Sequence, residues 1–230
     1  MGCKTPPDGR KLNTSKKTRR SIKYKKDINR EKENLIVIGI NCNGLSGKRD
    51  SLSANLEILR PSIFFIQETK FMRKGLYKAQ DYEIFENIRP TGGGSILTGI
   101  HQNLNPILIS DGHEDNIEIL VVEGRIQERN CRFINAYGPQ EFADLDKRIQ
   151  FYARLEEEII KAKMQNSMIC LELDANAKLG GEIIFNDPHK RSPNGELLLG
   201  IIVRNNLVVC NQPLIKLASI FFCRNDKIFV

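Results

Sequence analysis

The sequence predicts an α/β or α+β sandwich, in which helices pack on layers of β-sheet. Three observations support this fold class. A strand, a helix and another strand follow one another within residues 35–67, and five short strand-like runs then follow up to residue 137. A long helical pattern comes next, before further strand-like runs. A chain of 230 residues has room for one ordinary domain.

The first three elements form a βαβ-like unit. Residues 35–40 (LIVIGI) are a β-branched run typical of a buried strand, and residues 63–67 (IFFIQ) are the next strand. Between them, Asp50 or Ser51 can cap a helix that Pro61 ends. The apolar positions of this helix are Leu52, Leu56 and Leu59.

Five further strands are expected in the middle of the chain. They occupy residues 82–85, 95–100, 106–109, 117–123 and 132–137. Turn signals rich in Gly, Asn and Asp separate these runs. The close spacing favours antiparallel neighbours, because short turns can join only antiparallel strands.

A long amphipathic helix follows these strands. Its apolar residues step by three and four positions, with charged residues on the other face: Phe142, Leu145, Ile149, Tyr152, Leu155 and Ile159. Strands are expected at residues 167–173 and 207–210. Between them, Asn194 can cap a helix that Asn205–Asn206 close.

The positive charge of the chain is concentrated at its N-terminus. Residues 1–32 hold twelve Lys or Arg and three acidic residues, whereas the whole chain has a formal net charge of +7. The remaining residues are therefore slightly acidic. We expect residues 1–33 to be a basic, disordered tail, which either contacts nucleic acid or only keeps the protein soluble.

The composition argues against several classes of protein. No window approaches the ~18 uninterrupted apolar residues of a membrane span, and the N-terminus lacks the apolar core of a secretory signal. The six cysteines form no C-x-x-C pair, which disfavours a zinc site and a disulfide framework. These features predict an intracellular protein, nuclear or cytoplasmic, with no membrane partner. They do not predict an oligomeric state.

Polar side chains stand at the carboxyl ends of four predicted strands. In chain order they are Asn41 and Asn43, Gln67 and Glu68, Asn135 and Tyr137, and Asp174 and Asn176. Sites in layered α/β folds are usually assembled at such strand ends. Oxygen and amide groups without clustered Cys or His suit Mg²⁺ and the oxygens of a phosphate. The set therefore indicates phosphoester hydrolysis.

Six segments resemble the endonuclease/exonuclease/phosphatase family in order and spacing. They are INCNGLSG, IFFIQET, TGGGSILT, INAYGPQ, LELDANAKLG and SPNGELLLGIIVRNNLVVCN. The chain looks most like the branch found in non-LTR retrotransposons, next to the apurinic endonucleases. The resemblance covers about residues 34–211, and it implies a DNase I-like domain with a four-layered sandwich. In such a sandwich two mixed sheets pack face to face, with helices outside.

The resemblance implies a metal site and a catalytic site at the strand ends. Glu68 matches the carboxylate that binds the catalytic metal, Mg²⁺ or Mn²⁺, and Asn43 matches the residue that supports it. The four matches to catalytic residues are Asn41, which orders the site, Tyr137, which reaches the phosphate, Asp174, which orients or activates water, and Asn176, which stabilises the transition state. Glu172 matches no role and is expected to face solvent or to pair with a cation.

The end of the sequence departs from the family. The family continues with a Thr-containing strand, a Ser-x-Ile-Asp strand and a final Ser-Asp-His, and none of these follows Asn211. We therefore expect a C-terminally truncated member, with an incomplete second sheet and an atypical ending at residues 212–230. Three functions stay open: an Mg²⁺-dependent endonuclease that nicks DNA, an inactive relic that at most binds nucleic acid, and a phosphatase of the same family.

Overall fold

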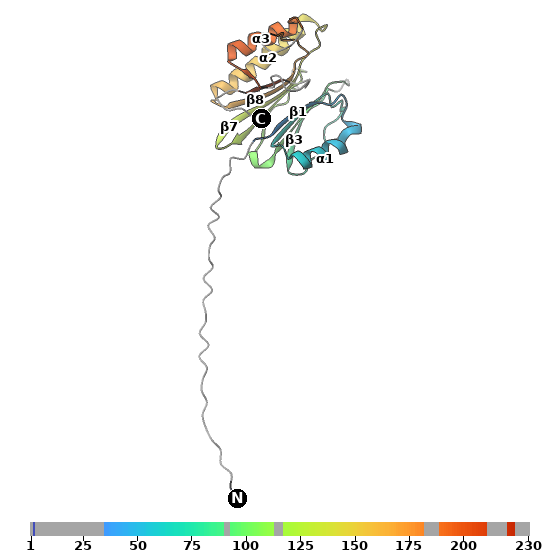
Figure 1. Cartoon of the computed structure of the whole chain (residues 1–230), viewed down its shortest axis with the longest axis vertical. Helices are drawn as coiled ribbons and strands as arrows, with labels where there is room; N and C mark the ends of the chain where they lie inside the picture. Colours follow the sequence, from blue (N-terminus) through green and yellow to red (C-terminus); the bar gives the residue numbers. More distant parts are fainter. Residues whose placement is uncertain are drawn as a thin grey trace. The chain divides into compact units, whose positions relative to one another are not determined.

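The structure is a computed structural model, and it describes residues 2, 35–89, 93–112, 117–181, 189–210 and 220–223 (Figure 1). Contacts set Asn34–Val230 apart as one compact unit. The expected tail at residues 1–33 lies outside the described residues, except for Gly2. In the described part of the chain, no helix combines the length and the hydropathy needed to cross a bilayer.

One sheet contains four strands in the order β1-β2-β4-β3. They are β1 (Val37–Asn41), β2 (Ile63–Gln67), β3 (Tyr82–Asn87) and β4 (Ile96–His101). The β1 and β2 strands are parallel and are joined through α1 (Arg49–Leu59), so the predicted βαβ unit is confirmed. The β4 strand runs antiparallel to both β2 and β3, as the close spacing predicted.

The other sheet has six strands in its described part, in the order β5-β6-β7-β8-β10-β9. They are β5 (Ile107–Ser110), β6 (Ile119–Ile126), β7 (Arg129–Tyr137), β8 (Met168–Asp174), β9 (Val208–Val209) and β10 (Ile220–Cys223). The β7 and β8 strands are parallel and are joined through α2 (Leu145–Met164). Part of the expected atypical ending thus forms β10, which pairs with both β8 and β9.

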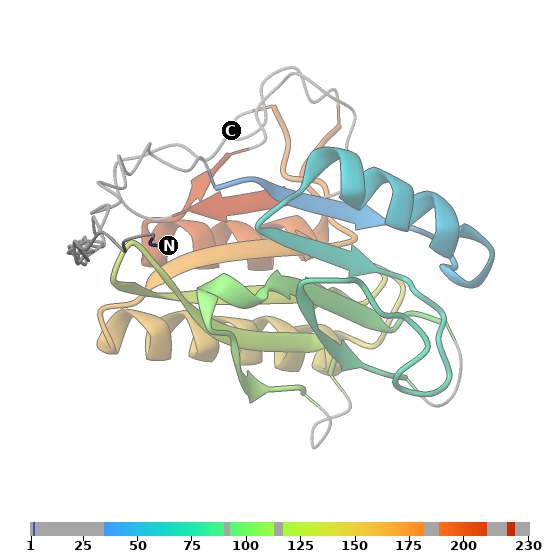
Figure 2. The same cartoon turned by 90° about the horizontal axis from the view of Figure 1, so that it is seen from below.

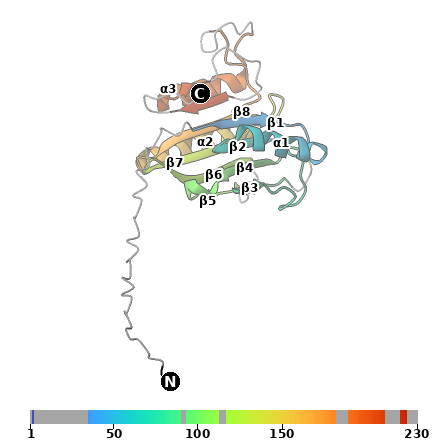
Figure 3. The same ribbon diagram turned by 60° about the horizontal axis from the view of Figure 1, so that its bottom comes forward.

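The two sheets pack face to face with helices on both outer sides (Figures 2 and 3). The core between the sheets joins Phe65 of β2 to Phe133 of β7. A second core packs α1 against the outer face of the four-stranded sheet. A third packs α2 and α3 (Pro193–Asn205) against the six-stranded sheet. The four-layered sandwich of two mixed sheets is therefore confirmed.

The apolar stripe predicted for the long helix is wrong over its first part. The α2 helix begins only at Leu145, where the Asp144 side chain caps it. Phe142 lies in the preceding turn with 91% of its surface exposed, and Leu145 and Ile149 are about half exposed. The buried face starts with Phe151 and continues through Tyr152, Leu155 and Ile159. The helical period of the sequence predicts the helix, but the position of the sheet on which α2 packs decides where its buried face starts.

The cap predicted for α3 is also wrong. Ser192, not Asn194, caps the helix, and its side chain accepts a hydrogen bond from the Gly195 N–H. A Ser-Pro pair explains this, since Pro193 fits the first helical position and Ser is a favoured cap. The predicted closure is confirmed, with Asn206 in the left-handed conformation at the C-terminus.

Candidate active site

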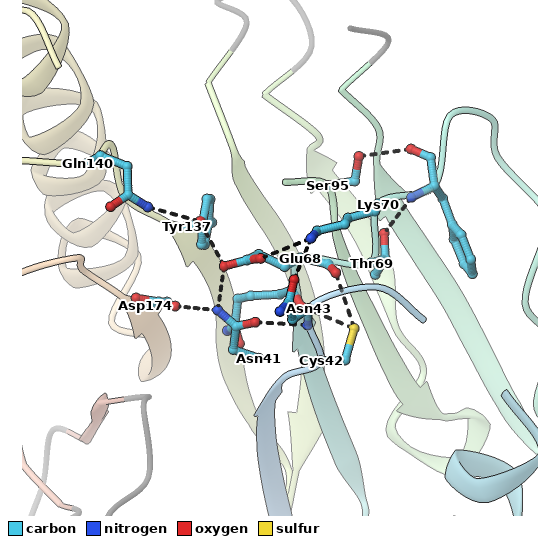
Figure 4. Close-up of polar contacts among 12 residues, drawn as sticks. Asn41, Cys42, Asn43, Glu68, Thr69, Lys70, Ser95, Tyr137, Gln140 and Asp174 are labelled. Atoms are coloured by element: carbon cyan, nitrogen blue, oxygen red, sulfur yellow. Dashed lines mark hydrogen bonds and ion pairs between the residues drawn. The ribbon is translucent and has the colours of Figure 1, made fainter. Parts of the chain in front are cut away.

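Two parallel strand pairs, one in each sheet, bring the predicted residues together. Asn41 is paired with Gln67 at the end of β1 and β2, and Tyr137 is paired with Asp174 at the end of β7 and β8. Parallel strands end at the same edge of their sheet. Because the sheets pack face to face, both edges open on one side, where Figure 4 shows their side chains converging.

Asn41 joins the two carboxylates of this site. Its Nδ2 donates to Glu68 Oε1 at 2.9 Å and to Asp174 Oδ2 at 2.7 Å (Figure 4). The Tyr137 hydroxyl donates to the same Glu68 oxygen at 2.9 Å. Four of the six predicted residues thus form one hydrogen-bonded group that bridges the two sheets.

Asn43 and Lys70 extend this group on one side. The backbone N–H of Asn43 donates to Asn41 Oδ1 at 3.1 Å. Lys70 Nζ donates to Asn43 Oδ1 and lies 4.0 Å from Glu68 Oε2. The Lys70 ammonium therefore sits between the two predicted metal ligands. Sequence reasoning missed Lys70, although it lies only two residues after Glu68.

Asn176 and Asn194 hold the other side. The Asn176 N–H donates to Asp174 Oδ1 at 3.2 Å, and its Nδ2 donates to the Gly138 carbonyl at 2.8 Å. Asn194 is fully buried, and its Nδ2 donates to the carbonyls of Pro139 and Asn176. Asn194 thus ties together the loops that follow β7 and β8. No local pattern in the sequence marks this contact.

The backbone at Glu68 is in an unusual conformation. Its φ of 52° is positive, which is uncommon for a residue other than Gly, Asn or Asp. Hydrogen bonds hold this turn from both sides, since Gly44 N–H and the Cys42 thiol donate to the Glu68 carbonyl and Thr69 N–H donates to the Ser95 carbonyl. Backbone strain of this kind persists where the surroundings over-determine it, and it clusters at functional sites.

Burial raises the pKa of two groups at the open edge, the Asp174 carboxyl and the Tyr137 hydroxyl. Desolvation raises the pKa of the Asp174 carboxyl above 3.8, although the Asn41 and Asn176 hydrogen bonds oppose the shift. Desolvation and the neighbouring Glu68 raise the pKa of Tyr137 to about 12. Asp174 is therefore a stronger base than an exposed aspartate, and Tyr137 stays a hydrogen-bond donor at neutral pH.

Three other polar residues of these strands point between the sheets instead. Gln67 Nε2 on β2 donates to Asn135 Oδ1 on β7 at 2.9 Å, so these two amides link the two sheets in their interior. Glu172 lies two residues before Asp174 on β8 and is fully buried. The expectation that Glu172 faces solvent is therefore wrong. It packs against Gly39 of β1, where an added Cβ would lie 2.2 Å from Glu172 Oε1.

A pocket of about 710 Å³ opens beside this group. Its lining includes Glu68, Lys70 and Tyr137, together with Phe142 from the turn before α2 and Lys147 from the first turn of α2. Gln140 also lines the pocket, and its Nε2 donates to the Tyr137 hydroxyl at 3.3 Å (Figure 4). The pocket can therefore admit a ligand larger than a phosphate group.

The oxygen donors at the strand ends fit a hard divalent cation. Mg²⁺ takes one or two carboxylates and keeps several waters, so it does not need a large cluster of acids. Glu68 and Asn43 already surround a cationic group, the Lys70 ammonium. In the described residues, no three His, Cys, Asp or Glu side chains gather as a metal cluster. A soft-metal site such as zinc does not fit this donor set.

Several solved structures are similar to the chain. AP endonuclease LMAP from Leishmania major aligns over 81% of this chain and 77% of its own, with a TM-score of 0.64 and 14% identity. The endonuclease domain of TRAS1, a telomere-specific non-LTR retrotransposon, aligns over 81% and 84%, with a TM-score of 0.59 and 15% identity. The 3′-5′ exonuclease NExo from Neisseria meningitidis aligns over 81% and 86%, with a TM-score of 0.62 and 13% identity.

These similarities are structural. No protein-family model and no curated protein sequence matches the chain. At 13–15% identity the structures named above show a shared fold and nothing finer. The chain therefore has the DNase I-like fold that its sequence motifs predict.

Proposed function

We propose that the protein is an Mg²⁺-dependent phosphodiesterase that nicks DNA, as a retrotransposon endonuclease does. The observation that carries this proposal is the group of Asn41, Glu68, Tyr137 and Asp174, which joins two carboxylates, an amide and a phenol at one open edge. Water attack on a phosphodiester needs a base, donors for the phosphate oxygens and a bound cation. This group and its neighbours offer a base, donors and the oxygens that would hold a cation.

Asp174 acts as the general base in this proposal. Asn41 and the Asn176 N–H orient its two oxygens, and burial raises its pKa. A water oxygen forms a bond to phosphorus while Asp174 takes one of the water protons. The ester bond on the opposite side of the phosphorus breaks, and the leaving oxygen takes a proton from solvent. Positioned general bases contribute about 10²–10⁴-fold to such rates.

In this proposal Tyr137 and Asn176 donate hydrogen bonds to the phosphate oxygens. The Tyr137 hydroxyl must turn from Glu68 Oε1 to do so, whereas Asn176 Nδ2 can keep one N–H on the Gly138 carbonyl and use the other. The Tyr137 hydroxyl keeps its proton at neutral pH because its pKa is raised to about 12. Asn176 lies two residues after the base, just past the end of β8. Donors aimed at oxygens that gain negative charge lower the barrier to phosphoester cleavage.

Glu68 and Asn43 would hold the metal. Asp174 lies close to them, because Asn41 hydrogen-bonds to both Glu68 and Asp174. When bound, Mg²⁺ polarises a phosphoryl oxygen and neutralises the charge that develops on it. Lys70 must release Asn43 Oδ1 for this amide to serve as a ligand. Mn²⁺ has the same preference for oxygen ligands and should replace Mg²⁺.

DNA is the proposed substrate. The similar solved structures include an AP endonuclease and a retrotransposon endonuclease domain, which supports a nucleic-acid substrate over a small phosphate ester. The basic residues 1–32 support the same choice, since Lys and Arg bind phosphates of either strand without regard to sequence. A DNA substrate also agrees with an intracellular protein.

Nicking of supercoiled plasmid tests the proposal. The full chain is compared with Asp174→Asn in Mg²⁺ and in EDTA, after circular dichroism has shown that both proteins are folded. We expect nicking by the parent only with Mg²⁺, and a loss of about 10²–10⁴-fold in the variant. Equal nicking by both proteins would indicate a contaminating nuclease, and no nicking by a folded parent would reject the proposal in favour of a protein that only binds nucleic acid.

A further inference from the structure

An exposed aromatic ring stands at the rim of the pocket beside the active-site group. Phe142 has 91% of its surface exposed, the highest fraction among the exposed large hydrophobic residues of the described chain. It lines the same pocket as Glu68 and Tyr137. Burying a Phe side chain is worth about 1.5–3 kcal/mol, so a ligand that covered this ring would gain free energy from the contact.

The turn that carries Phe142 is held in place from the active site. Gln140 Nε2 donates to the Tyr137 hydroxyl at 3.3 Å, and the Ala143 N–H donates to the Gln140 carbonyl at 2.9 Å (Figure 4). Asn194 Nδ2 donates to the carbonyl of Pro139 at 2.9 Å. The turn therefore holds the backbone of Phe142 at a set place relative to Tyr137. The exposed ring offers a flat apolar surface in the pocket that Tyr137 also lines.

The charged side chains that line the pocket have an excess of one positive charge. Five charged residues line the pocket: Glu68, Lys70, Arg89, Glu118 and Lys147. Lys70 lies against Glu68 and Arg89 is paired with Glu118, which leaves Lys147 as the excess charge. The Lys147 ammonium makes no hydrogen bond or ion pair in the described part of the chain, and Lys147 follows Phe142 by five residues. The Gln140 and Gln150 amides also line the pocket and can bind the edge of a base.

We infer that Phe142 is a stacking platform for an unpaired DNA base next to the scissile phosphate, with Lys147 on the adjoining phosphate. A nucleotide combines a flat π-face with a negative charge, which are the two features that this rim offers. Stacking on an aromatic side chain tolerates any base, so the platform would select single-stranded or distorted DNA over regular duplex. This inference rests on the proposed function for its substrate, and it adds the residue that holds the base.

The absence of tryptophan from the chain allows a direct test. Phe142→Trp introduces a single indole at the rim, and Met164→Trp places the same indole at the far end of α2, where Met164 is 83% exposed. A single-stranded oligonucleotide should quench the emission of Phe142→Trp and leave that of Met164→Trp unchanged. Equal quenching of both, or of neither, would overturn the inference.

Binding measurements give the magnitude. Fluorescence anisotropy with a labelled single-stranded oligonucleotide should show that Phe142→Ala weakens binding by about 5–150-fold, which is the range for one stacked base. Lys147→Gln should weaken it and flatten its salt dependence. Met164→Ala is the matched control and should bind as the parent does. Parent-like binding by Phe142→Ala would overturn the inference.

Two results distinguish a failure of this inference from a failure of the proposed function. Quenching and tight binding without any nicking would keep the stacking platform and reject the phosphodiesterase. Nicking by the parent, with no change in the emission of Phe142→Trp on adding the oligonucleotide, would reject the stacking platform and keep the phosphodiesterase.

Vesicles of phosphatidylcholine and phosphatidylserine test whether the rim binds a membrane surface instead. A blue shift in the emission of Phe142→Trp with these vesicles, but not with DNA, would assign the rim to a membrane surface and overturn the inference.

Discussion

Asn41 donates a 2.7 Å hydrogen bond to Asp174, although 133 residues separate them in the sequence. The same amide nitrogen donates to Glu68, so a single neutral side chain holds two carboxylates that would otherwise repel each other. Asn41 belongs to one sheet and Asp174 to the other. This contact therefore ties the shape of the site to the packing of the whole sandwich.

Replacing Asn41 by Ala should destabilise the protein as well as inactivate it. The change leaves Asp174, which is largely buried, without its side-chain donor, and lost partners of this kind cost about 1–3 kcal/mol. Urea unfolding at neutral pH without metal measures the loss. Asn55→Ala is the control, since the Asn55 amide binds the Ser51 carbonyl on an exposed helix, and it should change stability by less than about 0.5 kcal/mol. Equal effects would contradict the prediction.

The pH dependence of stability should report the buried Asp174 carboxyl. Because its folded pKa is raised above 3.8, the folded chain holds this proton to a higher pH than the unfolded chain does. Protonation therefore favours folding below pH 3.8, and this contribution is lost as the pH rises through the folded pKa. We expect Asp174→Asn to be more stable than the parent at neutral pH, with a difference that shrinks toward about pH 4.

Urea unfolding of metal-free protein across this pH range measures the difference. Asp50→Asn on the exposed first turn of α1 is the control, and the free energy of unfolding of this variant should differ from that of the parent by the same amount at every pH. A gap between Asp174→Asn and the parent that stays constant with pH would mean that the carboxyl does not titrate as its burial implies.

Removing the Lys70 ammonium should ease metal binding. Lys70 contacts both predicted metal ligands, so it competes with a divalent cation for the same oxygens. An exposed ion pair contributes at most about 1 kcal/mol, so Lys70→Met should lower the Mg²⁺ concentration at half-effect by up to about fivefold. The rise in melting temperature with MgCl₂ gives this value without any assay of activity. Lys78→Met is the exposed control, and a requirement for more Mg²⁺ in Lys70→Met would refute the competition.

Asn194 should matter for the site and not only for stability. Asn194→Ala removes the donor to the Asn176 and Pro139 carbonyls, with an expected loss of about 1–3 kcal/mol and lower nicking activity. Asn206→Ala at the other end of α3 places Ala in a left-handed conformation and should lower stability by a similar amount. If the loss of activity only follows stability, both variants will lose it equally, and the positioning role of Asn194 will be wrong.

Sequence patterns were most reliable where burial was complete. The β2 strand has the predicted bounds, because all five of its residues are buried and a proline precedes it closely. The β7 strand starts at Arg129, three residues before its predicted start, in an exposed polar stretch that pairs with β6. Hairpin pairing extends a strand beyond its apolar core, and a hydrophobic pattern cannot show where it stops.

The candidate site was predictable to the extent that its residues follow strands. Glu68 and Asp174 could be named because each stands at the carboxyl end of an apolar run. Neither Lys70 nor Asn194 could be assigned to the site from the hydrophobic period of the sequence. Lys70 is placed by a turn in which Glu68 has a positive φ, and Asn194 reaches the site from a helix that begins after a long loop.

Except for β10, the sequence by itself determined which segments become strands and which polar residues stand at their ends, because hydrophobic period and turn residues act locally. Only the tertiary structure decided which of those polar residues meet. Gln67 and Asn135 point between the sheets and bind each other, whereas Glu68, one residue later, turns to the open edge. Successive side chains of a strand point to opposite faces, and a left-handed residue redirects the chain. The partner of each group therefore depends on how the two sheets pack, which no local pattern encodes.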